Sequence, residues 1–239
     1  LEPLIKEKNI SQTIIVQAAD TVAETEFTLK LASNNEFVAG VVGWVDLEKK
    51  ETKEILDTLS ENKYLKGIRP MIHDISNDDW MLKDNLKDNI FYLSNKNLTF
   101  DALVRPQHLK NLIKFAKKYD FLPIVIDHIA KPKILNSEID EWKKDMKELS
   151  NFDNVFCKFS GILTEVGSDY TKEQIDPYID FILNLFSFNK IMWGSDWPVL
   201  TMAENYGKWF DLAMQYCNSF SESEKKMIFA ETAKNFYNI

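Results

Sequence analysis

The stretch Lys190–Leu200, KIMWGSDWPVL, places an acidic side chain directly after a short apolar run. The run Ile191–Trp193 predicts a buried strand that ends at Gly194, and Asp196 then stands between a serine and a tryptophan. In a purely structural interpretation, Asp196 is the N-cap of the turn that follows it. Capping does not require the flanking Trp-Pro, so we favour a functional carboxylate that activates water or binds a metal.

Six more apolar runs precede this one, and amphipathic helical patterns lie between them. Most runs lack strict alternation of apolar and polar residues, which indicates burial on both faces and a parallel sheet. Their spacing is typical of successive β-α units. The runs are Thr13–Gln17, Phe37–Val45, Leu65–Met71, Leu98–Val104, Leu122–His128 and Val155–Ser160.

The pattern predicts an α/β fold, a distorted (β/α)8 TIM-like barrel in a single domain over residues 1–239. Seven units are visible after the end of a helix, so we expect an eighth strand to precede residue 1. A doubly wound sheet is the rival fold. None of the seven glycines forms GxGxxG, which leaves a dinucleotide site without support.

The residues at three helix starts lead to further predictions. Pro177 is expected to begin a helix, with Asp176 as its N-cap. Ser221 and Glu224 predict a capping box at the start of the last helix. His108 is expected at the surface, at the opening of another helix.

The composition excludes several classes of partner. The 239 residues carry a net charge of -8, which argues against a nucleic-acid surface. No apolar run approaches the roughly 20 residues that span a bilayer, so no membrane partner is expected. The two cysteines are far apart in sequence, which indicates neither a disulfide framework nor a zinc knuckle and favours a reducing, cytoplasmic location. A small-molecule partner fits these features, and a homo-oligomer stays open.

The chemistry of a parallel barrel lies at the carboxyl ends of its strands. Each apolar run here ends in polar or aromatic groups that can converge on a small molecule. The residues at these ends are Gln17, Trp44, Asp46, Arg69, Arg105, Asp127, His128, Lys158, Ser160 and Asp196.

Among these groups, His128 can bind a metal, donate to a carbonyl oxygen or orient water, and a backbone-bonded core histidine is the structural alternative. His73 lies just past another strand end, and the same functional and structural interpretations apply to it. Arg69 and Lys158 are cations inside apolar runs, where each needs either a carboxylate partner or a ligand. Trp44 and Trp197 pack in the core or stack against a sugar face.

A metal centre needs about three protein ligands and an open position for water. If one divalent, zinc-like metal binds, His128 and Asp196 are its candidate ligands, and His73 completes a set on paper. The sequence has no HxH and no HExxH, which argues against a complete metal site in this chain alone.

Taken together, six segments resemble the amidohydrolase-related barrel hydrolases, and more narrowly their sugar-lactonase group of L-fuconolactonases and L-rhamnonolactonases. The resemblance covers essentially the whole chain in order, and the combination of DHIAKP, CKFSG and GSDWP is specific to this group. The segments are Gly40–Leu47, Leu65–Asp74, Val125–Pro132, Val155–Glu165, Ile191–Val199 and Glu231–Ile239.

The resemblance implies a distorted barrel that hydrolyses a cyclic ester, an aldono-lactone, to its hydroxy acid. It implies that Asp196 is the general base for water and that His128 is the second catalytic residue. It also implies a substrate-binding set formed by Arg69, Lys158, Trp44, Gln17, Trp197 and His73.

The family opens with a strand that carries an HxH pair, and no such segment occurs here. An absent N-terminal segment, a cleaved fragment and a degenerate relative are the three explanations, of which we favour the first. A decarboxylase or amide hydrolase on the same barrel, or a non-catalytic barrel that binds a sugar acid, is the alternative function. The sugar and the ring size do not follow from the sequence.

Overall fold

The computed structural model describes residues 1–239 and contains one sheet of seven parallel strands. The strands pair in chain order from β1 to β7, which confirms the parallel α/β prediction. A doubly wound sheet would reverse its strand order, and this sheet does not. The bounds are β1 Thr13–Val16, β2 Val38–Gly43, β3 Leu65–Ile68, β4 Thr99–Ala102, β5 Ile124–Ile126, β6 Val155–Phe159 and β7 Ile191–Trp193.

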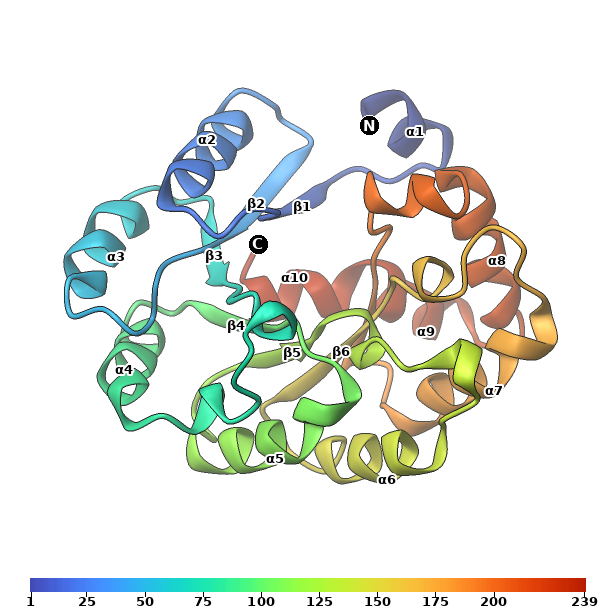
Figure 1. Ribbon diagram of the computed structural model, residues 1–239. Helices are drawn as coiled ribbons and strands as arrows, with labels where there is room; N and C mark the ends of the chain where they lie inside the picture. The colour runs from blue at the N-terminus through green and yellow to red at the C-terminus, as the bar shows by residue number, and fades with distance from the viewer.

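Most helices form an outer ring around the strands (Figure 1). The sheet curls but stays open, because β1 pairs only with β2 and β7 only with β6. The predicted eighth strand, outside residues 1–239, stays a prediction. The helices are α1 Glu2–Glu7, α2 Val22–Ser33, α3 Thr52–Ser60, α4 Lys87–Asn95, α5 Leu109–Lys118, α6 Asp140–Leu149, α7 Lys172–Leu185, α8 Tyr206–Tyr216, α9 Glu222–Lys226 and α10 Thr232–Tyr237.

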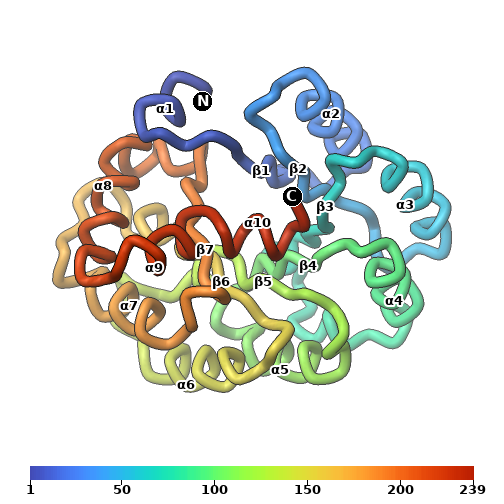
Figure 2. The backbone as a smooth tube through the Cα atoms, turned by 180° about the vertical axis from the view of Figure 1, so that it is seen from behind, coloured from blue at the N-terminus to red at the C-terminus, as the bar shows by residue number.

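Two apolar clusters hold this arrangement together. A cluster of 51 buried residues packs the sheet against the surrounding helices. A smaller one joins Val42, Val125 and Met192 of three strands to Phe236 and Tyr237 of α10. Figure 2 shows α10 crossing the middle of the ring. The last helix therefore fills the interior of the curled sheet and brings a tyrosine close to the strand residues.

The structure corrects two expectations about helices and confirms a third. Helix α7 begins at Lys172 rather than Pro177, because Gln174 accepts a hydrogen bond from the Thr171 N–H at 2.9 Å and the loss of one backbone bond at the proline is tolerated. His108 is buried rather than at the surface, since its ring bonds the Arg105 N–H and the carboxylate of Asp78.

The capping box predicted at the start of α9 is present. Glu224 Oε2 accepts from the Ser221 N–H at 2.7 Å, and Ser221 Oγ accepts from the Glu224 N–H at 3.3 Å. None of the helices combines the length and the apolar character that crossing a bilayer requires.

Candidate active site

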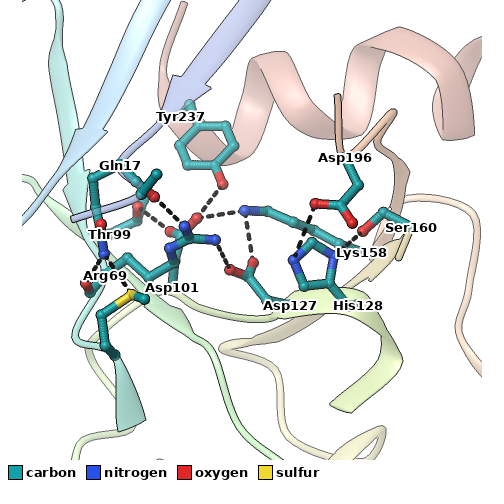
Figure 3. Close-up of polar contacts among 12 residues, drawn as sticks. Gln17, Arg69, Thr99, Asp101, Asp127, His128, Lys158, Ser160, Asp196 and Tyr237 are labelled. Atoms are coloured by element: carbon teal, nitrogen blue, oxygen red, sulfur yellow. Dashed lines mark hydrogen bonds and ion pairs between the residues drawn. The ribbon is translucent and has the colours of Figure 1, made fainter. Parts of the chain in front are cut away.

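Three strands bring a buried ion cluster together inside the curl of the sheet (Figure 3). Lys158 on β6 places its Nζ 2.6 Å from Asp101 Oδ2 on β4 and 2.7 Å from Asp127 Oδ1, just after β5. The hydroxyl of Tyr237 on α10 donates to Asp101 Oδ2 at 2.6 Å. Both carboxylates are fully buried, so the lysine between them compensates charges that water does not reach.

Arg69, which follows β3, continues this cluster toward β1. Its Nη1 donates to Asp127 Oδ2 at 3.0 Å, and its Nη2 donates to the backbone oxygen of Gln17. The Gln17 amide in turn donates to the Arg69 carbonyl at 2.8 Å. Gln17 is fully buried, and its two bonds with Arg69 hold the arginine in place.

The ion cluster sets the charge of its members. Burial alone would raise the pKa of Asp127, but Lys158 and Arg69 together hold it below its ordinary value. Burial lowers the pKa of Lys158, and the two carboxylates outweigh it, so the net shift is upward. Asp127 and Lys158 are therefore both charged at neutral pH.

The catalytic pair predicted from the sequence does come together. His128 Nε2 lies 3.6 Å from Asp196 Oδ1, and Nδ1 shares a hydrogen bond of 2.9 Å with Ser160 Oγ. Burial lowers the pKa of His128 to about 3, so its imidazole is neutral at pH 7. Burial raises the pKa of Asp196 to about 6, in the range that suits a general base near neutral pH.

An unusual backbone turn positions His128. Residues 128–131 have φ values of 53°, 49°, 63° and 47°, which is four consecutive non-glycine residues in the left-handed region. Trp142 Nε1 donates to the Ile129 carbonyl at 2.8 Å and fixes the turn from outside. Gly161 packs so closely on the imidazole that a Cβ there would lie 2.6 Å from its atoms. Trp142 therefore holds the turn, while Gly161 packs directly against the ring.

Asp196 also has a positive φ, 55°, and its side chain is 13% exposed. It does not cap the turn that follows, because that turn carries no side-chain cap. Gly194 holds the segment through a bond from Trp209 Nε1 to its carbonyl at 2.9 Å. The carboxylate thus faces His128.

The remaining predicted residues are partly exposed. Trp197 is 37% exposed and Trp44 is half-buried. His73 places its Nε2 3.1 Å from Asp74 Oδ2, and burial lowers its pKa. Lys131, which was not predicted, lies at the end of the left-handed turn and places its Nζ 2.6 Å from Glu165 Oε1.

Three members of this site were not predicted from the sequence. Asp101 lies in the apolar run LTFDALV, where its acidic side chain was the available signal. Tyr237 comes from the last helix, and Lys131 follows His128 in the motif DHIAKP. The sequence gives no sign of which strands or helices face one another, and so these three stayed outside the prediction.

A catalytic zinc ion takes about three protein ligands. His128 Nε2 and Asp196 Oδ1 lie close enough to share one cation. No three His, Cys, Asp or Glu side chains of residues 1–239 converge as metal ligands. The residues present supply two ligands and do not by themselves fit a complete metal centre.

A curled parallel sheet with helices outside, and with a carboxylate and an imidazole at its carboxyl edge, defines an α/β-barrel enzyme. The chain belongs to the amidohydrolase family, whose model matches residues 1–239.

Known proteins agree with this assignment. The chain is 38% identical over 243 residues to the L-fucono-1,5-lactonase of Burkholderia ambifaria, covering 100% of this chain and 84% of that protein. A crystal structure of an amidohydrolase from Burkholderia multivorans with bound HEPES superposes with a TM-score of 0.93 at 26% identity, covering 100% of this chain and 87% of that one. A second crystal structure of an amidohydrolase from that organism contains bound zinc and gives a TM-score of 0.92 at 26% identity, with the same coverage.

Proposed function

We propose that this protein is a hydrolase that opens a sugar-derived lactone to its hydroxy acid. The observation that carries the proposal is the pair of Asp196 and His128, 3.6 Å apart at the carboxyl edge of a parallel sheet. The L-fucono-1,5-lactonase of Burkholderia ambifaria, at 38% identity, supports the substrate class. A small sugar lactone is the proposed partner, because the polar groups of the site converge from several strands, as the binding of a small polar molecule requires.

Asp196 acts as the general base in this proposal. Its carboxylate takes a proton from water while the water oxygen bonds to the lactone carbonyl carbon, a step typically worth about 10²–10⁴ in rate. The ring C–O bond then breaks, and the proton passes from Asp196 to the departing ring oxygen. The products are a hydroxyl group and a carboxylic acid, which loses its proton to solvent.

His128 orients the carbonyl in this proposal. A neutral imidazole that is bonded to Ser160 can direct its other nitrogen toward the water or the carbonyl oxygen. Arg69 and Lys158 form the floor and offer N–H groups to the sugar hydroxyls, while Gln17 holds the arginine. Trp44, Trp197 and His73 are partly exposed and line the entrance to the proposed site.

The proposed site offers a divalent ion two protein ligands. If an ion such as the zinc in the Burkholderia multivorans structure binds this protein, His128 and Asp196 are its two candidate ligands among residues 1–239. Activity measured with and without a chelator, followed by zinc, tests this part separately.

A pH-indicator assay against a panel of L- and D-aldonolactones tests the function. We expect rapid acid release with one sugar class and its loss in Asp196→Asn without a lower melting temperature. Turnover in Asp196→Asn at the wild-type rate would refute the role of the carboxylate. No acid release across the panel would refute the lactonase proposal.

A further inference from the structure

Two side chains at the carboxyl end of β6 hold the two residues that follow β5. Lys158 lies on β6 and Ser160 directly follows it, and because their positions differ by two, both side chains point to the same face of the sheet (Figure 3). Lys158 Nζ lies 2.7 Å from Asp127 Oδ1, and Ser160 Oγ lies 2.9 Å from His128 Nδ1. The strands β5 and β6 are paired neighbours, so β6 fixes both residues at the end of β5.

The hydroxyl of Ser160 is enclosed beside the imidazole. Ser160 is 1% exposed, and His128 is the hydrogen-bond partner that the structure gives to its hydroxyl. A Cβ at Gly194 would lie 3.1 Å from Ser160 Cβ and 3.5 Å from its Oγ, so the backbone that precedes Asp196 covers the other side. Gly161 covers the Nδ1 edge of the ring, since a Cβ there would lie 2.6 Å from Nδ1. The contact between serine and histidine is therefore shielded from solvent.

The hydrogen bond between these two side chains can run in either direction, because a neutral imidazole carries one hydrogen and accepts at its other nitrogen. If Nδ1 donates, the buried hydroxyl hydrogen of Ser160 has no acceptor, and a bare Nε2 lies 3.6 Å from the carboxylate of Asp196. Two acceptors would then face each other. If the hydroxyl donates to Nδ1, its hydrogen is paired and an Nε2–H faces the carboxylate. Both considerations select the second direction.

We infer that Ser160 is a positioning residue whose hydroxyl donates to His128 Nδ1 and keeps the imidazole hydrogen on Nε2, on the side of the ring that faces Asp196. Its consequence for catalysis rests on the proposed lactone hydrolysis. A fixed Nε2–H donates to the carbonyl oxygen, where negative charge develops, and does not take a proton from water. Asp196 is then the only base of the pair, and Ser160 acts through His128.

Nitrogen NMR of the histidine rings measures the position of the hydrogen directly. At about pH 8, a histidine with the ordinary pKa of about 6.5 is neutral, so its two nitrogens report the tautomer. His108 is the internal reference, because its Nδ1 accepts from the Arg105 N–H at 3.1 Å and its hydrogen is therefore on Nε2. The signals that disappear in His128→Gln belong to His128, and we expect them to match the pattern of His108. A hydrogen on His128 Nδ1 would overturn the inference.

Kinetics test whether Ser160 acts through His128. In Ser160→Ala, we expect kcat to fall by about 3- to 10-fold, the equivalent of one neutral hydrogen bond, while KM changes by less than about 2-fold, because the positioned N–H acts on charge that develops in the transition state. In the His128→Gln background, the same substitution should have no further effect. Thr28→Val is the control, because it removes another buried hydroxyl, which bonds the Glu24 carbonyl at 3.0 Å within α2. It should leave kcat at the wild-type level.

A purely structural role for Ser160 gives a different result. Ser160→Ala would then lower the melting temperature at an unchanged kcat, or lower kcat equally in both backgrounds, and either result would overturn the inference. If His128→Gln does not fold, the ring signals that change in Ser160→Ala identify His128, and the wild-type tautomer decides; no change in any ring signal would also overturn the inference. If the wild type hydrolyses no lactone, the proposed function fails on its own, and the tautomer still decides the direction of the bond from Ser160.

Discussion

Removing the ammonium of Lys158 would expose the energetics of the buried cluster. In Lys158→Met, the side-chain volume is nearly kept, but Asp101 loses its only cation and Asp127 keeps only Arg69. Because both carboxylates are fully buried, we expect a loss of about 3–5 kcal/mol in the free energy of unfolding. For a chain of this size, that corresponds to a fall of about 6–20 °C in melting temperature.

The sign of the pH dependence identifies the cause. Burial already raises the pKa of Asp101, and removing Lys158 raises it further above the unfolded value. A folded-state pKa above the unfolded one means that stability is lost as the pH rises through the folded pKa and is regained below it. The deficit of Lys158→Met should therefore be larger at about pH 7.5 than at about pH 5. Urea denaturation at both pH values measures it.

Two further variants complete this experiment. Adding Asp101→Asn to Lys158→Met removes the unpaired charge and should recover part of the lost stability. Lys208→Met, at a side chain that is 69% exposed, should change stability by no more than about 0.5 kcal/mol. A deficit below about 1 kcal/mol, or one that is the same at both pH values, would refute the view that the lysine compensates buried carboxylates.

The remaining predictions concern the catalytic pair and its supports. Asp196→Asn should lower kcat by about 10²–10⁴ without lowering the melting temperature. In the wild type, kcat/KM should rise with pH through an apparent pKa near 6, because the deprotonated Asp196 is the base and burial raises its pKa to about 6. Gly161→Ala should cost about 1–3 kcal/mol of stability and most of the activity, because the new Cβ would lie 2.6 Å from the His128 ring. Tyr237→Phe should cost about 1.5–3 kcal/mol, measured by urea denaturation, since it removes a hydrogen bond to a buried carboxylate on β4.

Each of these predictions has a clear contrary result. A kcat/KM that is flat between about pH 5 and pH 8 would contradict the role of Asp196. Gly167→Ala is the control for Gly161→Ala, because Gly167 has a φ of 83° but no atom within 4 Å of the position that a new Cβ would take. Equal losses in the two alanine variants would assign the effect to backbone strain alone. Wild-type stability in Tyr237→Phe would show that the hydroxyl does not support the ion cluster.

The strands and the proximity of Asp196 to His128 were predictable because their signals are local. A short apolar run that ends in a polar residue predicts both a buried strand and a group at its carboxyl edge. Parallel strands then bring those edges together, which is how Asp196 and His128 come to lie 3.6 Å apart although they are distant in sequence. The opening of α7 was misplaced because proline inside a helix is rarer than proline at its start.

The partners of the cations were not predictable because they depend on the curvature of the sheet. Lys158 and Asp101 are 57 residues apart, and Tyr237 is 136 residues from the carboxylate that it contacts. Sequence patterns predict that a buried lysine needs a carboxylate, but several carboxylates satisfy that requirement equally well. The partner is decided only when β4, β5 and β6 pair in the sheet and α10 packs inside the curl.

The left-handed turn at residues 128–131 costs conformational free energy, and the cost falls at the proposed site. No residue of the turn is glycine, and Ile129 is β-branched, a class for which a positive φ is an outlier. Each such residue costs roughly 1–2 kcal/mol, and the cost is borne by the burial of the turn and by the bond from Trp142. A loop that served only to connect β5 with α6 would have no reason to keep this conformation. The turn directs the His128 ring toward Asp196, so the strain falls where the proposed chemistry needs a fixed imidazole.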